Sequence, residues 1–304
     1  MGILSTFDKI VWGSTVIVTF LVLFILGGGL LISWYPDPID ARAALIKSYY
    51  DIVYVYLEGE GITGRGEAAP SGRYDEFTDD ILSVLKSGIS LPESMTDPVS
   101  FSDIVFPQCK GIKSLEVAFS MAILDWWCQM QAMPLYQYLG ADPSIAPKTS
   151  YTISIGDPDL IPEKVQESMP YAILKVKLGI GLSEDKAMMN AIREHTDKLI
   201  RVDANEGWDL STGVEMCKWL ADQNVEFVEQ PFKSTNLTDT AELRSKSPLP
   251  LIADENSLYS GDIPGIEGVF DGINIKLMKC GSIFEAQKMI QRSEERRVGK
   301  ECRS

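Results

Sequence analysis

The sequence of 304 residues has one histidine, His195, and its five cysteines lie far apart without a CxxC pair. Histidine triads and histidine-rich metal sites are therefore excluded, and the cysteines predict neither a disulfide framework nor a zinc site. Lysine and arginine are scarce too, 28 against 43 acidic residues, for a formal net charge of −15. Because nucleic-acid surfaces need a basic patch, we expect no nucleic-acid partner. We expect buried thiols in a reducing compartment, hence a cytoplasmic location for the folded part.

Charge is missing altogether from residues 10–36, which are mostly apolar. A run longer than roughly 18 apolar residues is a candidate transmembrane helix, because about 20 helical residues cross the hydrocarbon core. We therefore expect an N-terminal apolar helix, with membrane contact through residues 10–36 and membrane anchoring if the segment is genuine. The alternative is that residues 1–40 were joined to the folded part by a faulty gene model.

The C-terminal end also has an unusual sequence. Residues 292–304 (RSEERRVGKECRS) resemble the translation of a sequencing adapter, so we expect the native sequence to end near Gln291. The alternative is a charged continuation of the preceding helix. Between the two ends we expect two folded parts, over residues 41–148 and 149–291.

The first folded part combines strand and helix patterns. Residues 51–58 (DIVYVYLE) and the ITGRGEAAP segment after them predict two strands. Residues 75–87 and 114–138 predict helices, and the second is apolar almost all round, which is typical of a buried helix. Pro134 is expected to kink or end that helix.

From Thr149 onward, short β-branched runs alternate with helical patterns. The runs that predict strands are residues 150–155, 173–178, 199–205, 227–232, 251–256 and 272–279. The helical stretches between and after them include residues 183–194, 211–223 and 282–291. Such alternation is typical of βαβ units with a parallel sheet, and six units without a GxGxxG motif favour a barrel over an open sheet.

Acidic residues stand at the C-terminal ends of three successive predicted strands. Asp203 and Asn205 end the third strand, Glu229 ends the fourth, and Asp254 and Glu255 end the fifth. A barrel collects such side chains at one site, and carboxylate oxygens suit Mg²⁺. A lone aspartate there is equally well explained as a helix N-cap, but three in register favour a metal site. We predict that Asp203, Glu229 and Asp254 bind Mg²⁺.

Lysines are predicted inside the same barrel. Lys175 and Lys177 are two residues apart on the second strand, so they share one face. Lys276 belongs to the sixth strand, across the barrel, whereas Lys279 lies past the strand's end in a supporting or surface role. Nearby positive charge disfavours the ammonium form, so one lysine can act as a base. We expect Lys177 and Lys276 to move a proton next to a metal-bound carboxylate, with inversion at that carbon.

The motifs KxK, VDAN, VEQPF, ADEN and INIKLMK, in this order and spacing, resemble the muconate-lactonising branch of the enolase superfamily. The resemblance covers residues 50–291. Within the branch, the SYTISIG strand, the KLGIG turn and the KLMKCGSI run are most similar to dipeptide epimerases acting on Ala-Glu-like dipeptides. It implies a Mg²⁺-dependent epimerase with a small-molecule carboxylate or dipeptide substrate. Lys177 and Lys276 would be the acid/base pair, Lys175 would support Lys177, Thr152 would touch the substrate, and Asn205 and Lys279 would assist.

The resemblance also implies an α/β fold, with an α+β capping domain over residues 41–148 and a (β/α) barrel over residues 149–291. The family's barrel has eight strands, and this chain offers six, so we expect an incomplete barrel besides the N-terminal apolar helix. An o-succinylbenzoate synthase or a cycloisomerase would use the same lysines and metal. A membrane-anchored binding protein without catalysis, or an inactive fragment, is the alternative from another class. A homo-oligomer stays open.

Overall fold

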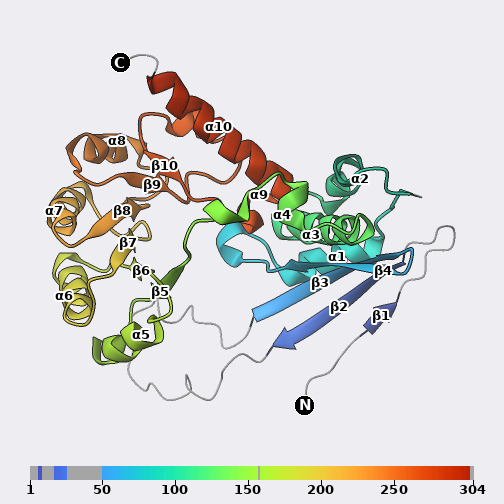
Figure 1. The fold of residues 1–304 in the computed structure, drawn as a ribbon, viewed down its shortest axis with the longest axis horizontal. Helices are drawn as coiled ribbons and strands as arrows, with labels where there is room; N and C mark the ends of the chain where they lie inside the picture. The colour runs from blue at the N-terminus through green and yellow to red at the C-terminus, as the bar shows by residue number, and fades with distance from the viewer. Residues whose placement is uncertain (1–5, 9–16, 26–49, 93, 157, 302–304) are drawn as a thin grey trace. The chain divides into compact units, whose positions relative to one another are not determined.

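The computed structural model describes residues 6–8, 17–25, 50–92, 94–156 and 158–301. The chain divides into two compact units, which are shown with their elements in Figure 1. Unit 1 comprises Met1–Pro143 and Lys276–Gln287, and unit 2 comprises Ser144–Ile275 and Lys288–Ser304. Each unit has a hydrophobic core of its own.

Unit 1 contains an antiparallel sheet. Its strands, in the order in which they pair, are β1 (Thr6–Asp8), β2 (Ile17–Ile25), β3 (Tyr50–Gly59) and β4 (Ile62–Ala68). Its helices are α1 (Thr78–Ser87), α2 (Pro98–Val105), α3 (Lys113–Met130), α4 (Leu135–Tyr138) and α9 (Leu277–Cys280). The long α3 packs on the sheet so closely that a Cβ added at Gly66 of β4 would lie 1.8 Å from the carbonyl oxygen of Ala118. The predicted buried helix is thus confirmed, and it ends before Pro134 as expected.

The predicted N-terminal apolar helix is wrong at residues 17–25. These residues form β2, which pairs antiparallel with β3 from Ile17 opposite Glu58 to Ile25 opposite Tyr50. The segment IVTFLVLFI is rich in β-branched and aromatic residues, which favour a strand when a partner strand is available. The rest of residues 10–36 lies outside the described residues. Within the described residues, none of the helices is both long and apolar enough to cross a membrane.

Unit 2 contains the predicted parallel sheet. Its six strands pair in chain order: β5 (Ser150–Ile153), β6 (Ile173–Lys177), β7 (Leu199–Asp203), β8 (Val225–Glu229), β9 (Leu251–Ala253) and β10 (Gly272–Ile273). The helices between them are α5 (Ile161–Glu167), α6 (Leu182–Arg193), α7 (Leu210–Ala221) and α8 (Leu237–Lys246). Figure 1 shows these helices along one side of the sheet. The predicted alternation of strand and helix, and the parallel sheet, are confirmed.

The core of unit 2 fixes the direction of the side chains on each strand. On β6, Leu174 and Val176 are fully buried in the core with helix residues such as Met189. Because side chains alternate along a strand, Lys175 and Lys177 point to the opposite face. Each large apolar side chain buried in this way contributes about 1.5 to 3 kcal/mol, so the core fixes which face the lysines occupy.

The sixth strand is shorter than predicted. Residues 272–279 were expected to be extended, but β10 ends at Ile273 and α9 begins at Leu277. Lys276 is therefore the N-cap residue of α9, and its carbonyl oxygen accepts hydrogen bonds from the N–H groups of Lys279 and Cys280. The helix α10 (Ile283–Glu301) follows and continues through most of residues 292–304. That these residues are not native stays a prediction.

Candidate active site

Strand register brings the predicted residues of unit 2 into one row. Lys177 pairs with Asp203, and Asp203 pairs with Glu229. The register between β7 and β8 is irregular, because Ile200 pairs with Val225 whereas Val202 pairs with Val228. Strand β8 therefore has one extra residue, a β-bulge, and the bulge is what places Glu229 beside Asp203.

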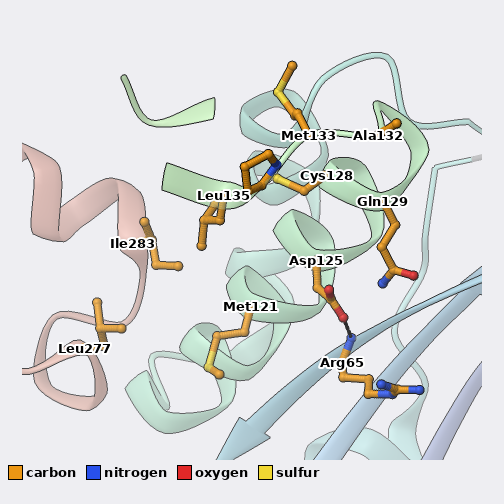
Figure 2. A pocket seen from close by; sticks show the side chains of 11 residues that line it. Arg65, Met121, Asp125, Cys128, Gln129, Ala132, Met133, Leu135, Leu277 and Ile283 are labelled. Atoms are coloured by element: carbon orange, nitrogen blue, oxygen red, sulfur yellow. Dashed lines mark hydrogen bonds between the residues drawn. The ribbon is translucent and has the colours of Figure 1, made fainter. Parts of the chain in front are cut away.

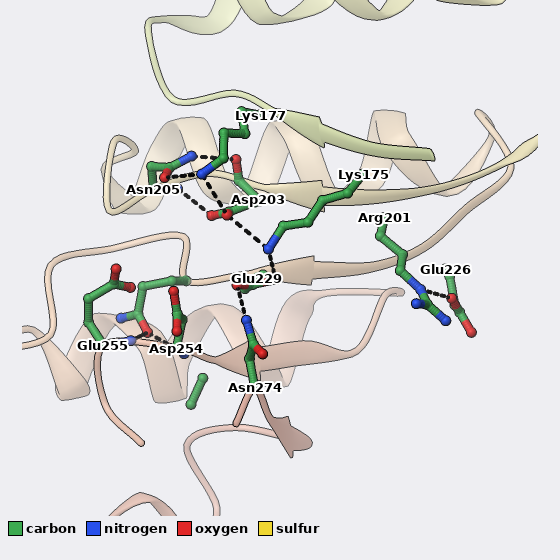
Figure 3. Close-up of polar contacts among 12 residues, drawn as sticks. Lys175, Lys177, Arg201, Asp203, Asn205, Glu226, Glu229, Asp254, Glu255 and Asn274 are labelled. Carbon is green, nitrogen blue, oxygen red and sulfur yellow. Dashed lines mark hydrogen bonds and ion pairs between the residues drawn. The ribbon is translucent and has the colours of Figure 1, made fainter. Parts of the chain in front are cut away.

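Lys175 lies between two buried carboxylates. Its Nζ is 2.6 Å from Glu229 Oε2 and 3.1 Å from Asp203 Oδ2, and both acids are only 3% exposed (Figure 3). Burial disfavours the charged ammonium, but the attraction of Asp203 and Glu229 outweighs it and raises the pKa of Lys175. Lys175 is thus the protonated partner of both acids.

Lys177 is held at the rim of this cluster. Its Nζ lies 3.2 Å from Asn205 Oδ1 and 3.4 Å from Asp203 Oδ2, and 37% of its side chain is exposed. Asn205 has φ +47, and it donates to Asp203 through its backbone N–H and its side-chain Nδ2, both at 3.1 Å. The ammonium group of Lys177 can thus be reached from solvent, whereas that of Lys175 is largely enclosed.

Asp254 follows the next strand, β9, and is 2% exposed. The buried side chain of Gln230 fixes the loop that carries it. Oε1 of Gln230 accepts from the N–H groups of Asp254 at 2.9 Å and Glu255 at 3.0 Å. Its Nε2 donates to Asn256 Oδ1 and to the Phe232 carbonyl oxygen. Figure 3 shows Asp203, Glu229 and Asp254 at three successive strand ends.

Two contributors were missed by the sequence analysis. Asn274, directly after β10, donates from Nδ2 to Glu229 Oε1 at 2.7 Å, so both oxygens of Glu229 are occupied. The other is Gln230, whose role depends on side-chain contacts between loops. Gln230 and Asn274 were predicted to lie within strands, whereas in the structure each directly follows the end of one, β8 and β10.

The remaining predicted residues are placed differently. Thr152 on β5 is exposed and pairs in register with Lys175 of β6. It therefore lies two residues before the level at which Lys177, Asp203 and Glu229 pair. Lys276 and Lys279 belong to unit 1. Lys279 is only 5% exposed, so the expectation of a surface role for it is wrong. It lies in α9, which packs against α3.

Two pockets, one in each unit, differ in the character of their walls. One, of about 730 Å³ in unit 1, has mostly apolar walls that include Met121, Leu135 and Ile283, and its charged lining residues are Arg65 and Asp125 (Figure 2). The other, of about 280 Å³ in unit 2, opens beside Lys177. Its walls include Ile155, Pro158, Leu178, Ile180 and Met188. Because this second pocket contacts Lys177, a predicted catalytic residue, we place the candidate active site in unit 2.

The donor set can be tested for its fit to Mg²⁺. In the described parts of the chain, no group of three acidic, histidine or cysteine residues is arranged to hold a metal ion. The ammonium group of Lys175 contacts both Asp203 and Glu229. Yet Asp203, Glu229 and Asp254 are each at most 3% exposed, and all offer the carboxylate oxygens that Mg²⁺ prefers. Buried carboxylates are costly without matching positive charge. The chemistry of the donor set therefore fits a divalent cation.

Comparisons with known proteins all indicate one family. Residues 161–302 match the family described as Enolase C-terminal domain-like. The L-Ala-D/L-Glu epimerase of Bacteroides thetaiotaomicron is 34% identical over 276 residues, which are 87% of this chain and 71% of that protein. A hydrophobic dipeptide epimerase from a Flavobacteria bacterium is 35% identical over 254 residues, covering 78% of this chain and 70% of the relative.

A solved structure agrees with these relatives. The dipeptide epimerase of Enterococcus faecalis V583, complexed with Mg and the dipeptide L-Leu-L-Tyr, superposes with a TM-score of 0.72 at 30% identity. The similarity covers 81% of this chain and 72% of that one. The chain therefore belongs to the Enolase C-terminal domain-like family, in the muconate-lactonising branch of the enolase superfamily that includes the dipeptide epimerases.

Proposed function

We propose that the chain is a Mg²⁺-dependent isomerase that epimerises dipeptides by removing and returning the α-proton of a residue next to its carboxylate. The observation that carries the proposal is the row of Lys177, Asp203 and Glu229, in which an accessible amine stands beside buried carboxylates. The named activities of the relatives and the dipeptide in the solved complex support the substrate class.

In this proposal Asp203, Glu229 and Asp254 hold Mg²⁺. When bound, the cation would bind the substrate carboxylate and stabilise the charge that develops as the α-proton leaves. Lys175 stays protonated and would move away from one carboxylate oxygen to admit the metal, while keeping its positive charge near the site. Asn274 holds Glu229 from the other side, so this carboxylate keeps its orientation.

The lysines carry the proton. Lys177 would take the proton from one diastereomer and return it when the reaction runs the other way, with Asn205 orienting its Nζ. Lys276 is proposed as the acid/base group for the opposite face. Thr152 would contact the substrate, and the buried Lys279 would support the segment that carries Lys276.

The pocket beside Lys177 bears on the substrate. Its walls include the apolar residues Ile155, Leu178 and Met188, together with Glu184 and Asp185. Because the named relatives act on both acidic and hydrophobic dipeptides, substrates of both kinds should be tested. L-Ala-L-Glu and L-Leu-L-Tyr cover the two chemistries.

The test is α-proton exchange in D₂O with added Mg²⁺, followed by NMR for each diastereomer separately. We expect the wild-type chain to exchange the α-proton and to form the other diastereomer. Lys177→Ala and Lys276→Ala should each lose epimerisation but retain exchange from opposite diastereomers, because each leaves one base in place. The exposed Lys218 on α7 gives a matched control, Lys218→Ala, which should be fully active. Absence of exchange with acidic and hydrophobic dipeptides alike would refute the proposal.

A further inference from the structure

Asp185, in the first turn of α6, is a buried carboxylate that the proposed chemistry does not use. It is 1% exposed, and its oxygens accept four hydrogen bonds. Both Oδ atoms accept from the N–H of Gly179 at 3.0 Å, and Oδ1 also accepts from the N–H of Ile180 at 3.2 Å. Oδ2 accepts from Trp208 Nε1 at 2.7 Å. One side chain therefore joins two loops.

The two loops are those that carry the candidate site. Gly179 and Ile180 come directly after Lys177 and Leu178, whereas Trp208 lies in the loop, with Asn205, that connects Asp203 at the end of β7 to α7. The Leu178 N–H donates to the Asp203 carbonyl oxygen at 2.8 Å. The position of the Lys177 amine relative to Asn205 thus depends on how these two loops are held together.

The backbones of the loops meet without intervening side chains. A Cβ added at Gly207 would lie 2.2 Å from the carbonyl oxygen of Gly179, and one added at Gly179 would lie 2.1 Å from that of Ala204. Gly179 also has φ +103, which other residues rarely adopt. The backbones of the two loops are therefore in direct contact at these glycines. Asp185 supplies a side-chain link from the adjacent helix.

We propose that Asp185 is a positioning residue that holds the Lys177 loop against the Asp203–Asn205 loop and so fixes the Lys177 amine for proton transfer. The inference rests on the proposed function, in which Lys177 and Lys276 serve opposite faces of the substrate. The proposal predicts that loss of Asp185 affects the two directions of the reaction unequally, because Asp185 contacts the loop that follows Lys177 directly. Loss of the contact should slow the Lys177-dependent proton transfer much more than the Lys276-dependent one.

The variant Asp185→Asn tests this, because an amide replaces one acceptor oxygen by a donor that faces N–H groups. We expect it to lower exchange from the Lys177-dependent diastereomer by about ten- to a hundred-fold, as misplacement by about 1 Å can do. Exchange from the other diastereomer should fall by less than about three-fold. The exposed Asp222, at the end of α7, provides the matched control Asp222→Asn, which should exchange both diastereomers normally.

Trp208→Phe provides a second variant that keeps the ring and removes only the Nε1–H donor. It should show the same asymmetry at a smaller size, and it decides the matter if Asp185→Asn does not fold. An equal fall for both diastereomers in the folded variants would overturn the proposal, since a merely structural role would reduce the active fraction without regard to direction.

The wild-type measurement separates this inference from the proposed function. If the wild-type chain exchanges no α-proton, the proposed function fails, and Asp185 is then tested by labelling of lysine amines with acetic anhydride and mass spectrometry. We expect the labelling rate of Lys177 to change at least about three-fold in Asp185→Asn, while that of the exposed Lys218 stays the same. Unchanged labelling of Lys177 would overturn the positioning role.

Discussion

Replacement of Lys175 by methionine separates the role of its charge from that of the metal. Lys175 Nζ lies 2.6 Å from Glu229 and 3.1 Å from Asp203, and its side chain is only 19% exposed. Lys175→Met keeps much of the volume of the side chain but leaves two buried carboxylates next to each other. Removing one partner from a buried ion pair costs about 3 to 5 kcal/mol, because the remaining charge is uncompensated. Without Mg²⁺ we therefore expect a loss of about 3 to 5 kcal/mol in the free energy of unfolding.

Mg²⁺ should restore part of this loss. Any ligand that binds only the folded state stabilises it, by about 1.4 kcal/mol at ten times its dissociation constant. In Lys175→Met the cation no longer competes with an ammonium group for Asp203 and Glu229, so Mg²⁺ should bind more tightly and raise the unfolding temperature more than in the wild-type protein. Epimerisation should still fall, because the positive charge beside the site is lost.

The assay is thermal unfolding, with and without Mg²⁺, of wild-type protein and Lys175→Met. A loss of this size should lower the unfolding temperature of a unit of this size by roughly 10 °C. Lys186 pairs with Glu215 at 2.6 Å on the surface, so Lys186→Met is a matched control that should cost less than about 1 kcal/mol. If Lys175→Met unfolds at the wild-type temperature without Mg²⁺, or gains nothing from the cation, the argument from buried charge is refuted.

Three further outcomes are expected. Gly179→Ala should lower the free energy of unfolding by about 3 kcal/mol or more in urea titrations, because its Cβ would lie 2.1 Å from the Ala204 carbonyl oxygen and its φ is positive. Gly268→Ala is the control: φ is +81 there but the space is open, so we expect a loss of about 1 kcal/mol. Gln230→Leu should lower the free energy of unfolding by about 2 to 4 kcal/mol, because the backbone N–H groups of Asp254 and Glu255 lose their acceptor. It should also weaken Mg²⁺ binding, measured by calorimetry, because the loop that carries Asp254 is no longer fixed. Burial raises the pKa of Cys217 to about 11, so at pH 8 its thiol is protonated, and iodoacetamide should label it, by mass spectrometry, only after unfolding. Rapid labelling of the folded protein would contradict that burial.

Local patterns in the sequence were enough to predict most of unit 2. Alternation between strand and helix predicted the parallel sheet, and the spacing of Lys175 and Lys177 placed both on one face, because side chains alternate along a strand. Asp203 and Glu229 were predicted at neighbouring strand ends because each lies near the C-terminal end of a predicted strand.

Features that depend on contacts between distant segments were not predictable in this way. The apolar residues 17–25 have the composition of a membrane helix, and only their pairing with β3 makes them a strand. Lys175 was expected to support Lys177, but it forms ion pairs with Asp203 and Glu229, which join residues of three neighbouring strands. The hydrogen bond from Asn274 to Glu229 joins residues that are 45 positions apart. Propensity and periodicity carry no information about such contacts.

The bulge in β8 shows why the site needs the structure as well as the sequence. If β8 followed β7 without it, Ile200 opposite Val225 would put Val228 opposite Asp203, and Glu229 would fall one residue past the row. Because side chains alternate, Val228 would then point to the lysines and Glu229 towards the helices. The extra residue reverses this, so Val228 is buried in the core and Glu229 reaches Lys175. The spacing of three between Val225 and Val228 is visible in the sequence, but it identifies a bulge only once the register of β7 is known. The extra residue between Val225 and Val228 interrupts the sheet, and it thereby brings Glu229 into the row of acidic groups.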